Sequence, residues 1–270
     1  MITVSIVTFS NEKNFFISNK KFKILQNSII YLCKIKIIKN ILIIDNSLKP
    51  YFSSLSDTNN KIIYKHLKGE NLGYGKAHNL SKKYLNMEKY HIVLNPDIIF
   101  YENNVITNLF EFMEKNKNVS LVQPLIKSYP DGSIQKVCKN NPTLLIQILR
   151  GFFNPLLKKI KLFSRYNDWY EMDKLAYGKD YINSEFLSGC FMFFRIEDLN
   201  TIGWFDEKFF MYLEDADITR RLSLIGKCIH KPDIFVGHVW ERGSHKNFKL
   251  RLIAIYSYFI YSLKWGLQIL

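Results

Sequence analysis

The segment His91-Ile92-Val93-Leu94-Asn95-Pro96-Asp97 is a short apolar run that ends in a carboxylate. Its length and its apolar, β-branched character predict a buried strand ending near Asp97. An earlier segment, Asn40-Ile41-Leu42-Ile43-Ile44-Asp45, has the same form and ends in Asp45. In an open parallel sheet, ligands bind at the carboxyl ends of the strands. Asp97 there suits a hard metal cation, and Asp45 suits a donor group of a base or ribose, although Asp also caps turns and helices.

The segments around these two strands alternate between strand and helix patterns. Three further apolar runs predict strands, and two amphipathic runs predict helices. Such a βαβ rhythm predicts an α/β fold with a mostly parallel, Rossmann-like sheet flanked by helices. The predicted strands are Ile2–Phe9, Lys61–His66 and Val119–Gln123, and the helices are Phe15–Cys33 and Gly73–Leu85.

The rhythm changes after Pro124. Tyr129-Pro130-Asp131-Gly132 predicts a turn in a small hairpin. Strands are expected at 181–185 and 190–195, a helix at 214–226, and a helical, aromatic tail after residue 246. We therefore expect one domain over residues 1–245, with a nucleotide-binding half (1–124) and an acceptor-binding and catalytic half (125–245). Residues 246–270 would form a C-terminal amphipathic helical tail.

Composition narrows the classes of protein that fit. The chain has 270 residues, and its 38 Lys and Arg against 24 Asp and Glu give a net charge of +14, which predicts a polyanionic partner. With 47% hydrophobic and 23% charged residues, a disordered chain is excluded. The four cysteines form no CxxC pair, which argues against a zinc ribbon or a disulfide framework. The first residues lack the features of a signal peptide, and no uncharged apolar run reaches the ~18–20 residues of a membrane span, so we expect a cytoplasmic protein.

Two segments carry further candidate chemistry. In Asn71-Leu72-Gly73-Tyr74-Gly75-Lys76-Ala77-His78-Asn79, two glycines precede a predicted helix, where backbone N–H groups can bind phosphate or ribose oxygens. It matches neither a Walker A loop nor GxGxxG. In the segment 204–217, aromatic residues precede Glu214, Asp215 and Asp217. An aromatic wall and neighbouring charges raise a carboxyl pKa, which suits a general base.

Asp217 has a structural alternative, because Arg220 and Arg221 follow it at helical spacing. Glu214 and Asp215 therefore remain as the candidate catalytic residues. His238 follows the apolar strand Ile234–Val236 and is a candidate metal ligand, although a single histidine is more often structural.

Taken together, these segments resemble glycosyltransferase family 2, inverting enzymes with the GT-A fold. The motifs occur in the family's order from Val4 to about Ser244. Two of them, Leu94–Asp97 and Phe210–Asp217, look most like those of rhamnosyltransferase-type members that build bacterial O-antigen and other surface polysaccharides. The matching segments are Val4–Phe9, Ile44–Ser47, Asn71–Gly75, Ser188–Met192, Leu94–Asp97 and Phe210–Asp217.

The resemblance implies a role for each candidate residue. Asp97 matches the last carboxylate of the family's DxD motif and, with His238, would bind Mg²⁺ or Mn²⁺. Asp215 matches the catalytic base. Asn95 departs from the pattern, because it replaces the first acid of DxD. The residues expected to bind the nucleotide-sugar are Thr8, Phe9, Asp45, Asn71, Gly73, Asn79, Asp97 and Gly189.

The implied reaction moves a sugar from a nucleotide-sugar to a saccharide acceptor linked to polyprenyl diphosphate, in O-antigen or lipopolysaccharide synthesis. dTDP-L-rhamnose is the preferred donor, and UDP-hexoses, including UDP-galactofuranose, remain alternatives. Such an acceptor would place the enzyme peripherally at the inner face of the plasma membrane. Phe152–Phe163 and Leu250–Leu270, basic and aromatic, are the expected interfacial helices.

Two other classes of protein fit part of the sequence. A sugar-nucleotide nucleotidyltransferase would be expected to carry a glycine-rich, basic loop after the first strand, whereas residues 10–14 are Ser-Asn-Glu-Lys-Asn. A nucleic-acid-binding protein would explain the charge but not the strand-end carboxylates or Glu214-Asp215, which would repel phosphates. We therefore expect no nucleic-acid partner.

Overall fold

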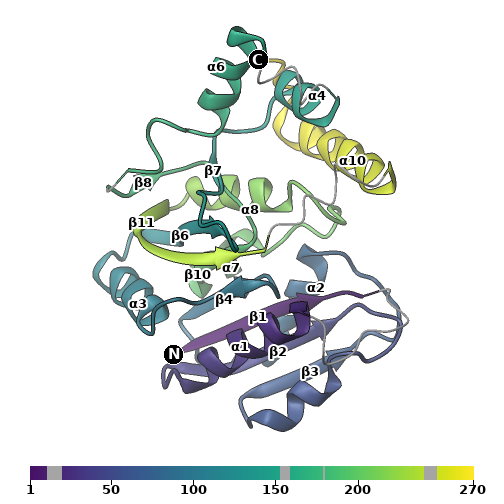
Figure 1. The fold of residues 1–270 in the computed structure, drawn as a ribbon, viewed down its shortest axis with the longest axis vertical. Coiled ribbons are helices and arrows are strands. Elements are labelled where there is room, and N and C mark those ends of the chain that lie inside the picture. The colour runs from purple at the N-terminus through teal and green to yellow at the C-terminus, as the bar shows by residue number, and fades with distance from the viewer. Residues whose placement is uncertain (11–19, 153–158, 179, 240–247) are drawn as a thin grey trace.

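A nine-stranded sheet runs through the part of the chain that the computed structural model describes, which is residues 1–10, 20–152, 159–178, 180–239 and 248–270 (Figure 1). The strand order is β3-β2-β1-β4-β10-β6-β11-β5, and β8 also pairs with β11. The strands are β1 (Ile2–Thr8), β2 (Ile38–Asp45), β3 (Ile62–His66), β4 (Tyr90–Leu94), β5 (Ile98–Ile99), β6 (Val119–Ser128), β8 (Ile182–Asn183), β10 (Phe191–Arg195) and β11 (Lys227–His238).

The sheet is mostly parallel, as the sequence predicts. β3, β2, β1 and β4 are parallel neighbours, and β6 is parallel to β11. β10 lies between the two groups and runs antiparallel to both β4 and β6. This inserted strand joins the two halves of the chain in one sheet and brings the segment before Phe191 to the carboxyl end of β4.

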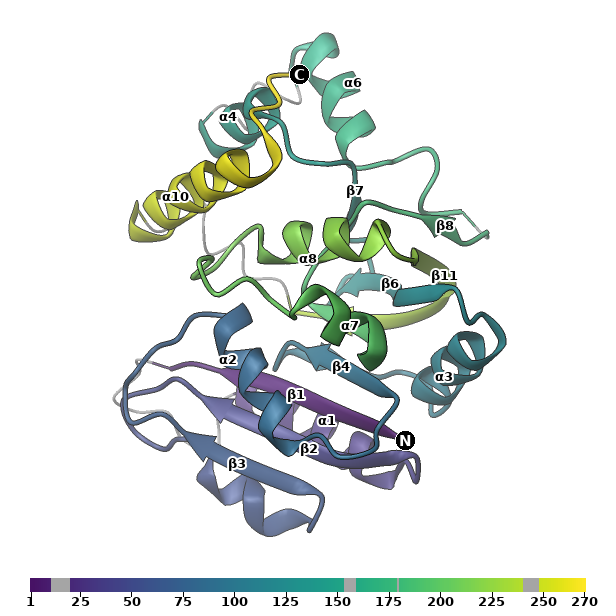
Figure 2. The same ribbon diagram turned by 180° about the vertical axis from the view of Figure 1, so that it is seen from behind.

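Helices cover both faces of the sheet. α1 (Lys20–Lys34) and α3 (Val105–Lys115) pack on one face, and α2 (Gly75–Asn79), α7 (Ile196–Ile202) and α8 (Glu214–Ser223) lie on the other (Figures 1 and 2). Successive side chains of a strand point to opposite faces. Ile92 and Leu94 accordingly join the cluster with α1 and α3, whereas Val93 joins the cluster with α7 and α8.

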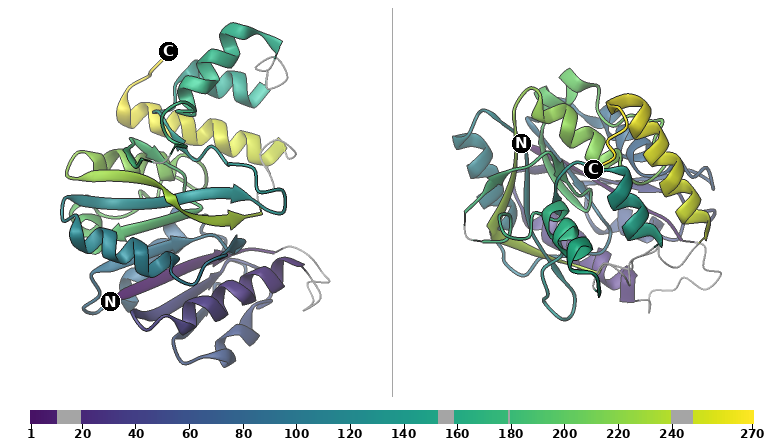
Figure 3. Two further views of the ribbon diagram at one scale, coloured as in Figure 1. Left: turned by 60° about the vertical axis from the view of Figure 1, so that its left-hand side comes forward. Right: turned by 90° about the horizontal axis from the view of Figure 1, so that it is seen from above.

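A third group of elements lies at one end of the molecule. α4 (Leu144–Phe152), α6 (Lys161–Tyr170) and α10 (Phe248–Trp265) gather there, far from β3 (Figure 3). A two-stranded sheet of β7 (Cys138–Lys139) and β9 (Phe186–Leu187) connects this group to the central sheet. Ile146, Phe186, Tyr258 and Tyr261 are among the buried residues of its apolar cluster, so α10 is packed against the domain.

Several element boundaries differ from the sequence-based expectation. β4 ends at Leu94, because Pro96 lacks the N–H that would continue the ladder. The predicted helix 73–85 is divided into α2 and the 3-10 helix η2 (Leu80–Tyr84). The predicted strand 181–185 is replaced by the two-residue strands β8 and β9. The 3-10 helix η1 (Ser53–Thr58) was not expected.

Other expectations are met. The turn at 129–132 closes a hairpin, in which the Ser128 N–H donates to the Ser133 carbonyl (2.7 Å) and Lys127 pairs with Ile134. Asp217 pairs with Arg221 (2.9 Å) and is fully buried, as its helical spacing indicates. The predicted segment 152–163 falls partly outside the described residues, because these omit 153–158.

Candidate active site

The carboxylate of Asp215 is held by backbone N–H groups at the start of α8. Gly189 N donates to Oδ2 and Ala216 N donates to Oδ1, each at 2.9 Å. The chain enters α8 through Tyr212 and Leu213, which have left-handed φ values of 73° and 64°. Such a backbone is unfavourable for non-glycine residues, and it is found where tertiary contacts impose it, often at functional sites. Its effect here is to direct the first turn of α8 toward the Gly189 loop.

Glu214 lies beside Asp215 and is 5% exposed. Burial, and then the neighbouring Asp215 charge, raise the pKa of Glu214 well above its usual value. Burial also raises the pKa of Asp215, but the charge of Lys139 and the N–H groups of Gly189 and Ala216 oppose that rise. Because Lys139 and the N–H groups of Gly189 and Ala216 stabilise its anion, Asp215 is the more readily ionised member of the pair.

A second polar cluster lies where β4 ends. His238 Nε2 is 3.2 Å from Asp97 Oδ1 and 3.2 Å from the Asn95 amide nitrogen. Asp97 Oδ1 is buried and has no hydrogen-bond partner among the described residues. The fold therefore brings together Asp97 and His238, which the sequence predicts as a pair although they lie far apart in the chain.

Gln135 determines which nitrogen of His238 carries hydrogen. Its side-chain NH₂ donates to the His238 carbonyl (3.0 Å), so its oxygen must face the ring, 2.9 Å from Nδ1. A carbonyl oxygen only accepts hydrogen bonds, which makes Nδ1 the donor. The lone pair of the ring is then on Nε2, where it accepts a hydrogen bond from the Asn95 amide (3.2 Å) beside Asp97 Oδ1. A cation that binds between Asp97 and His238 would replace this hydrogen bond.

The glycine loop lies against the segment that precedes α8. Gly73 has φ 77°, and a Cβ there would overlap the Phe210 carbonyl, so only glycine fits. Asn71 Oδ1 accepts the Gly73 N–H at 3.0 Å. The Tyr74 hydroxyl donates to the Gly189 carbonyl, which connects this loop with the loop that holds Asp215. A Cβ on Gly189 would lie 3.2 Å from the Tyr74 ring, so this contact also depends on glycine.

The other residues expected to bind the nucleotide have different surroundings. Thr8 and Asp45 are neighbours in the β1–β2 register and are buried, whereas Phe9 is 51% exposed. The Asp45 carboxylate accepts hydrogen bonds from the Tyr64 hydroxyl (2.6 Å) and the Ser47 N–H (3.0 Å).

The Asn79 amide also serves a contact within the protein. It donates to the Phe205 carbonyl (2.9 Å) and to Glu207 (3.1 Å), and it accepts the Phe205 N–H (3.1 Å). These contacts fasten α2 to the loop before α8, so the structure places Asn79 apart from Asp215.

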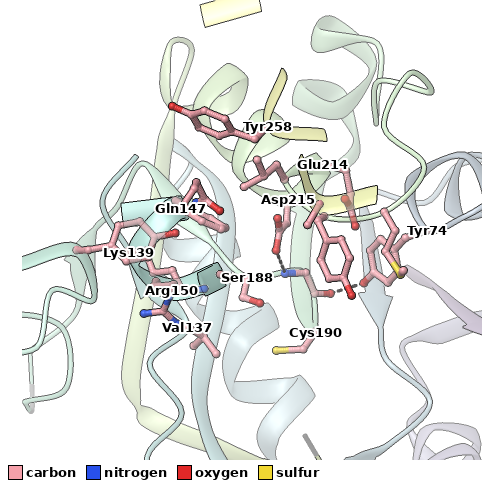
Figure 4. A pocket seen from close by; sticks show the side chains of 18 of the residues that line it. Tyr74, Val137, Lys139, Gln147, Arg150, Ser188, Cys190, Glu214, Asp215 and Tyr258 are labelled. Carbon is pink, nitrogen blue, oxygen red and sulfur yellow. Dashed lines mark hydrogen bonds between the residues drawn. The ribbon is translucent and has the colours of Figure 1, made fainter. Parts of the chain in front are cut away.

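A cavity of about 590 Å³ joins the Asp215 loop to the His238 cluster. Asp215 and Glu214 lie between Tyr74 on one side and Lys139 with Arg150 on the other (Figure 4). The sequence reasoning assigned no role to the following residues of its wall: Tyr74, Gln135, Lys139, Gln147, Arg150 and Tyr258. Tyr74 lay inside a motif, but Gln135 and Lys139 carried no local signal beyond a basic stretch.

Comparison with known proteins gives likenesses in sequence and fold. No family model matches the chain. The N-acetylglucosaminyl-diphospho-decaprenol L-rhamnosyltransferase of Mycobacterium tuberculosis is 28% identical over 171 residues, which are 58% of this chain and 52% of that protein. Rhamnosyltransferase WbbL of Escherichia coli K12 is 27% identical over 218 residues, 75% of this chain and 70% of WbbL. By sequence, this chain is rhamnosyltransferase-like.

The solved structures agree on the fold. The mannosyltransferase PcManGT of Pyrobaculum calidifontis, in complex with GDP-Man and Mn²⁺, superposes with a TM-score of 0.59 at 15% identity, covering 97% of this chain and 64% of that one. Residues 1–349 of TarS of S. aureus superpose with a TM-score of 0.55 at 13% identity, covering 94% and 64%. The GT-A fold expected from the motifs is confirmed. The chain matches about half the length of the mycobacterial relative.

Proposed function

We propose that this protein is an inverting glycosyltransferase that transfers a sugar from a nucleotide-sugar to a saccharide acceptor. The observation that carries the proposal is the single cavity that contains Asp215, an anion oriented by two N–H groups, together with His238 of the cluster at the end of β4. Direct displacement at an anomeric carbon requires a base for the acceptor hydroxyl and a site for the leaving diphosphate in the same cavity.

Asp215 acts as the general base in this proposal. Its carboxylate takes the proton of the acceptor hydroxyl, whose oxygen then attacks the anomeric carbon from the side opposite the leaving diphosphate. The C–O bond to the diphosphate breaks as the new C–O bond forms, so the configuration inverts. Burial and the Asp215 charge raise the pKa of Glu214, so Asp215 is the group of the pair that ionises more readily.

The residues at the end of β4 fit a divalent cation, Mg²⁺ or Mn²⁺. Asp97 offers a buried oxygen without a hydrogen-bond partner, and His238 offers the Nε2 lone pair. No cluster of three or more His, Cys, Asp or Glu side chains that could hold a metal occurs among the described residues, so Asp97 and His238 would share the ion with donor phosphates and water. Bound there, the cation would stabilise the negative charge of the departing nucleoside diphosphate.

The donor we favour is dTDP-L-rhamnose, because the curated relatives are both named as rhamnosyltransferases. UDP-hexoses, including UDP-galactofuranose, are the alternatives. We propose residues 1–124 as the nucleotide half, with the exposed ring of Phe9 and the loop at Asn71 and Gly73 against the nucleoside. In this assignment Thr8, Asp45 and Asn79 shape the pocket from behind, and Gly189 lies under the sugar.

The acceptor we propose is a saccharide on polyprenyl diphosphate, as in the name of the mycobacterial relative. Within the described residues, no helix combines the length and apolarity needed to span a membrane. α10 nevertheless exposes large apolar side chains, and basic residues flank them on α6 and α10. The exposed apolar residues at this end are Leu162, Phe248, Leu252, Ile255, Tyr256, Phe259 and Leu263.

This surface supports peripheral binding to the anionic inner face of the plasma membrane, at about 1 kcal/mol for each Lys or Arg near the headgroups. Residues 125–245 would then present the acceptor to Asp215, and the tail 246–270 would hold the enzyme at the membrane. We propose no nucleic-acid partner, because Glu214 and Asp215 in the cavity would repel a phosphate backbone.

A donor screen tests the function. The purified protein is incubated with dTDP-L-rhamnose, UDP-galactose, UDP-galactofuranose and UDP-N-acetylglucosamine, each with and without a lipid-linked N-acetylglucosaminyl diphosphate. We expect acceptor-dependent release of nucleoside diphosphate with one donor, and its loss in EDTA. The absence of acceptor-dependent release with every donor would contradict glycosyl transfer to such an acceptor.

Vesicle sedimentation tests the membrane contact. We expect binding to phosphatidylglycerol-containing vesicles, no binding to phosphatidylcholine vesicles, and weaker binding as salt rises. Exchanging the exposed lysines Lys159 and Lys161 for Glu should release the protein. Lys158, the third lysine of that stretch, lies outside the described residues. A Lys115→Glu/Lys117→Glu variant, at the end of α3 and just beyond it, carries the same charge change and serves as the control. Equal binding to both vesicle types would contradict this contact.

A further inference from the structure

Lys139 is a cation without an anionic partner in the wall of the cavity. The ion pairs of the described residues do not include it. Its ammonium instead lies 4.9 Å from the centre of the Phe186 ring and 6.0 Å from that of Tyr170. Aromatic faces stabilise an ammonium less than an anionic partner does, because the attraction comes only from the ring quadrupole.

Arg150 adds a second cation beside Lys139. Its guanidinium donates to Glu171 (2.6 Å) and Asn167 (2.8 Å) and lies 5.3 Å from the centre of the Tyr170 ring. Burial lowers the pKa of Lys139, and the charge of Arg150 lowers it further, against the opposing effect of Asp215. Glu171 pairs with Arg150 and, with Asp215, also opposes the lowering of the Lys139 pKa, but Lys139 has no ion pair of its own among the described residues. Its charge, next to that of Arg150, would stabilise a further anion in the cavity.

The part of the wall formed by α4 and α10 is largely apolar and leads to the surface, and besides Arg150 its polar members are Gln147 and Arg251. Leu144 and Ile148 of α4 face the cavity together with Ala254, Ile255 and Tyr258 of α10. Ile148 is 38% exposed and Ile255 is 51% exposed, so the apolar lining continues into the exposed face of α10. One cavity is therefore lined by the general base, by Lys139 and Arg150, and by apolar side chains of α4 and α10.

We propose that Lys139 and Arg150 form the subsite for the diphosphate of a lipid-linked acceptor, whose hydrocarbon chain leaves between α4 and α10. The inference rests on the proposed function, since it names the acceptor site of that reaction. Donor diphosphate is a different occupant, and geometry argues against it: Lys139 and Arg150 lie on the opposite side of Asp215 from Tyr74 and its nucleotide loop (Figure 4).

Binding of decyl diphosphate, below its micelle concentration, tests the subsite by calorimetry. We expect it to bind more tightly than inorganic diphosphate or decanol, because only this probe fills both the cationic and the apolar parts. Lys139→Met should weaken it about tenfold or more, the effect of losing one charge-assisted contact, and Lys139→Arg should restore most of the affinity. Lys117→Met, two residues beyond α3, removes a charge paired with Glu114 and is the control, which should bind as the unmodified protein does.

Three results would overturn the proposal. One is wild-type affinity in Lys139→Met, and another is inorganic diphosphate binding as tightly as decyl diphosphate, which would identify a free-phosphate site. The third is an equal loss of UDP binding with Mn²⁺, which would assign Lys139 to the donor. These titrations require no transfer, so they separate the two hypotheses. Lys139-dependent binding without any donor activity would contradict the function alone, whereas transfer with an unchanged acceptor KM in Lys139→Met would contradict the subsite alone.

Discussion

In the half of the molecule built on β1 to β4, three polar side chains of the motifs, Asp45, Asn71 and Asn79, are hydrogen-bonded within the protein. Asp45 is bonded to Tyr64 and Ser47, and Asn79 to the Phe205 loop. Asp97 Oδ1 at the end of β4 is the exception, because it has no hydrogen-bond partner among the described residues. In the half built on β6 to α8, Glu214 has a buried oxygen without a partner, and Lys139 has no ion pair among the described residues. A buried polar or charged group that the fold leaves without a partner costs stability, so such a group is a candidate for contact with a ligand.

The largest expected effect is on the transfer rate, and it distinguishes Asp215 from Asp217, two carboxylates of α8. Asp215→Asn should lower the transfer rate ~10²–10⁴-fold, because the amide is nearly isosteric but takes no proton. Its stability should change little, since removing a buried charge offsets a weakened hydrogen bond. Steady-state transfer rates and urea unfolding measure the two effects.

Asp217→Asn is the matched control for that variant. Asp217 is fully buried against Arg221, Lys264 and Trp265. The loss of its charge leaves the largely buried Arg221 without its ion pair, whereas Lys264 keeps Asp206. We expect this variant to lose about 3–5 kcal/mol of unfolding free energy. Near wild-type transfer by Asp215→Asn would assign the base to Glu214 instead.

Gln135→Leu tests the orientation of His238. Without the Gln135 oxygen, Nδ1 has no acceptor and the ring can adopt the other tautomer, which removes the Nε2 lone pair. We expect Mn²⁺ affinity in the presence of UDP to fall about 10–100-fold, the usual effect of removing a partner behind a metal ligand. Electron paramagnetic resonance of free Mn²⁺ measures it. Gln147→Leu, on the α4 side of the same cavity, should leave the affinity unchanged; an equal loss there would show a general effect of cavity polarity.

Asn79→Ala tests whether Asn79 stabilises the fold or contacts the nucleotide. It removes three hydrogen bonds and leaves the Phe205 N–H without its acceptor, so we expect a loss of about 1–3 kcal/mol in unfolding free energy. UDP and dTDP affinity should hold in the folded variant. Asn71 is exposed, so Asn71→Ala provides the comparison. In that variant we expect nucleotide affinity to fall and the free energy of unfolding to hold. A selective loss of nucleotide affinity in Asn79→Ala would restore the direct contact that the motif implies.

The smallest expected effect is the loss of folding stability as the pH falls. His78 Nδ1 lies 2.7 Å from Ser5 Oγ and His91 Nε2 lies 2.9 Å from it, and burial lowers both pKa values, that of His91 to about 3. Below an unfolded pKa of ~6.5, only the unfolded chain takes up these protons, so stability falls as pH falls. We expect a loss of roughly 1 kcal/mol per histidine between pH 7 and 5.5, measured by urea unfolding. In His91→Gln the slope should be smaller, and an equal slope would assign the acid sensitivity to other groups.

Much of the site could be predicted from local sequence. β4 and β2 were recognised because parallel strands buried on both faces need unbroken apolar runs, and the residue after such a run lies at the ligand edge. Asp217 was separated from Asp215 because helical spacing alone pairs it with Arg221. The boundaries of β8, β9 and η1 were not predictable, because segments of so few residues depend on the neighbours that pair with them.

Local pattern thus determined the α/β class, the two strand-end carboxylates and the start of α8, because each depends on contacts within a few residues. Only the tertiary structure decided which of those polar groups remain unpaired. The antiparallel insertion of β10 brings Gly189 to Asp215, Gln135 meets His238 from 103 residues away, and β7 sets Lys139 opposite the nucleotide loop. These contacts join segments far apart in the chain, and a short window of sequence carries no signal for a partner that lies outside it.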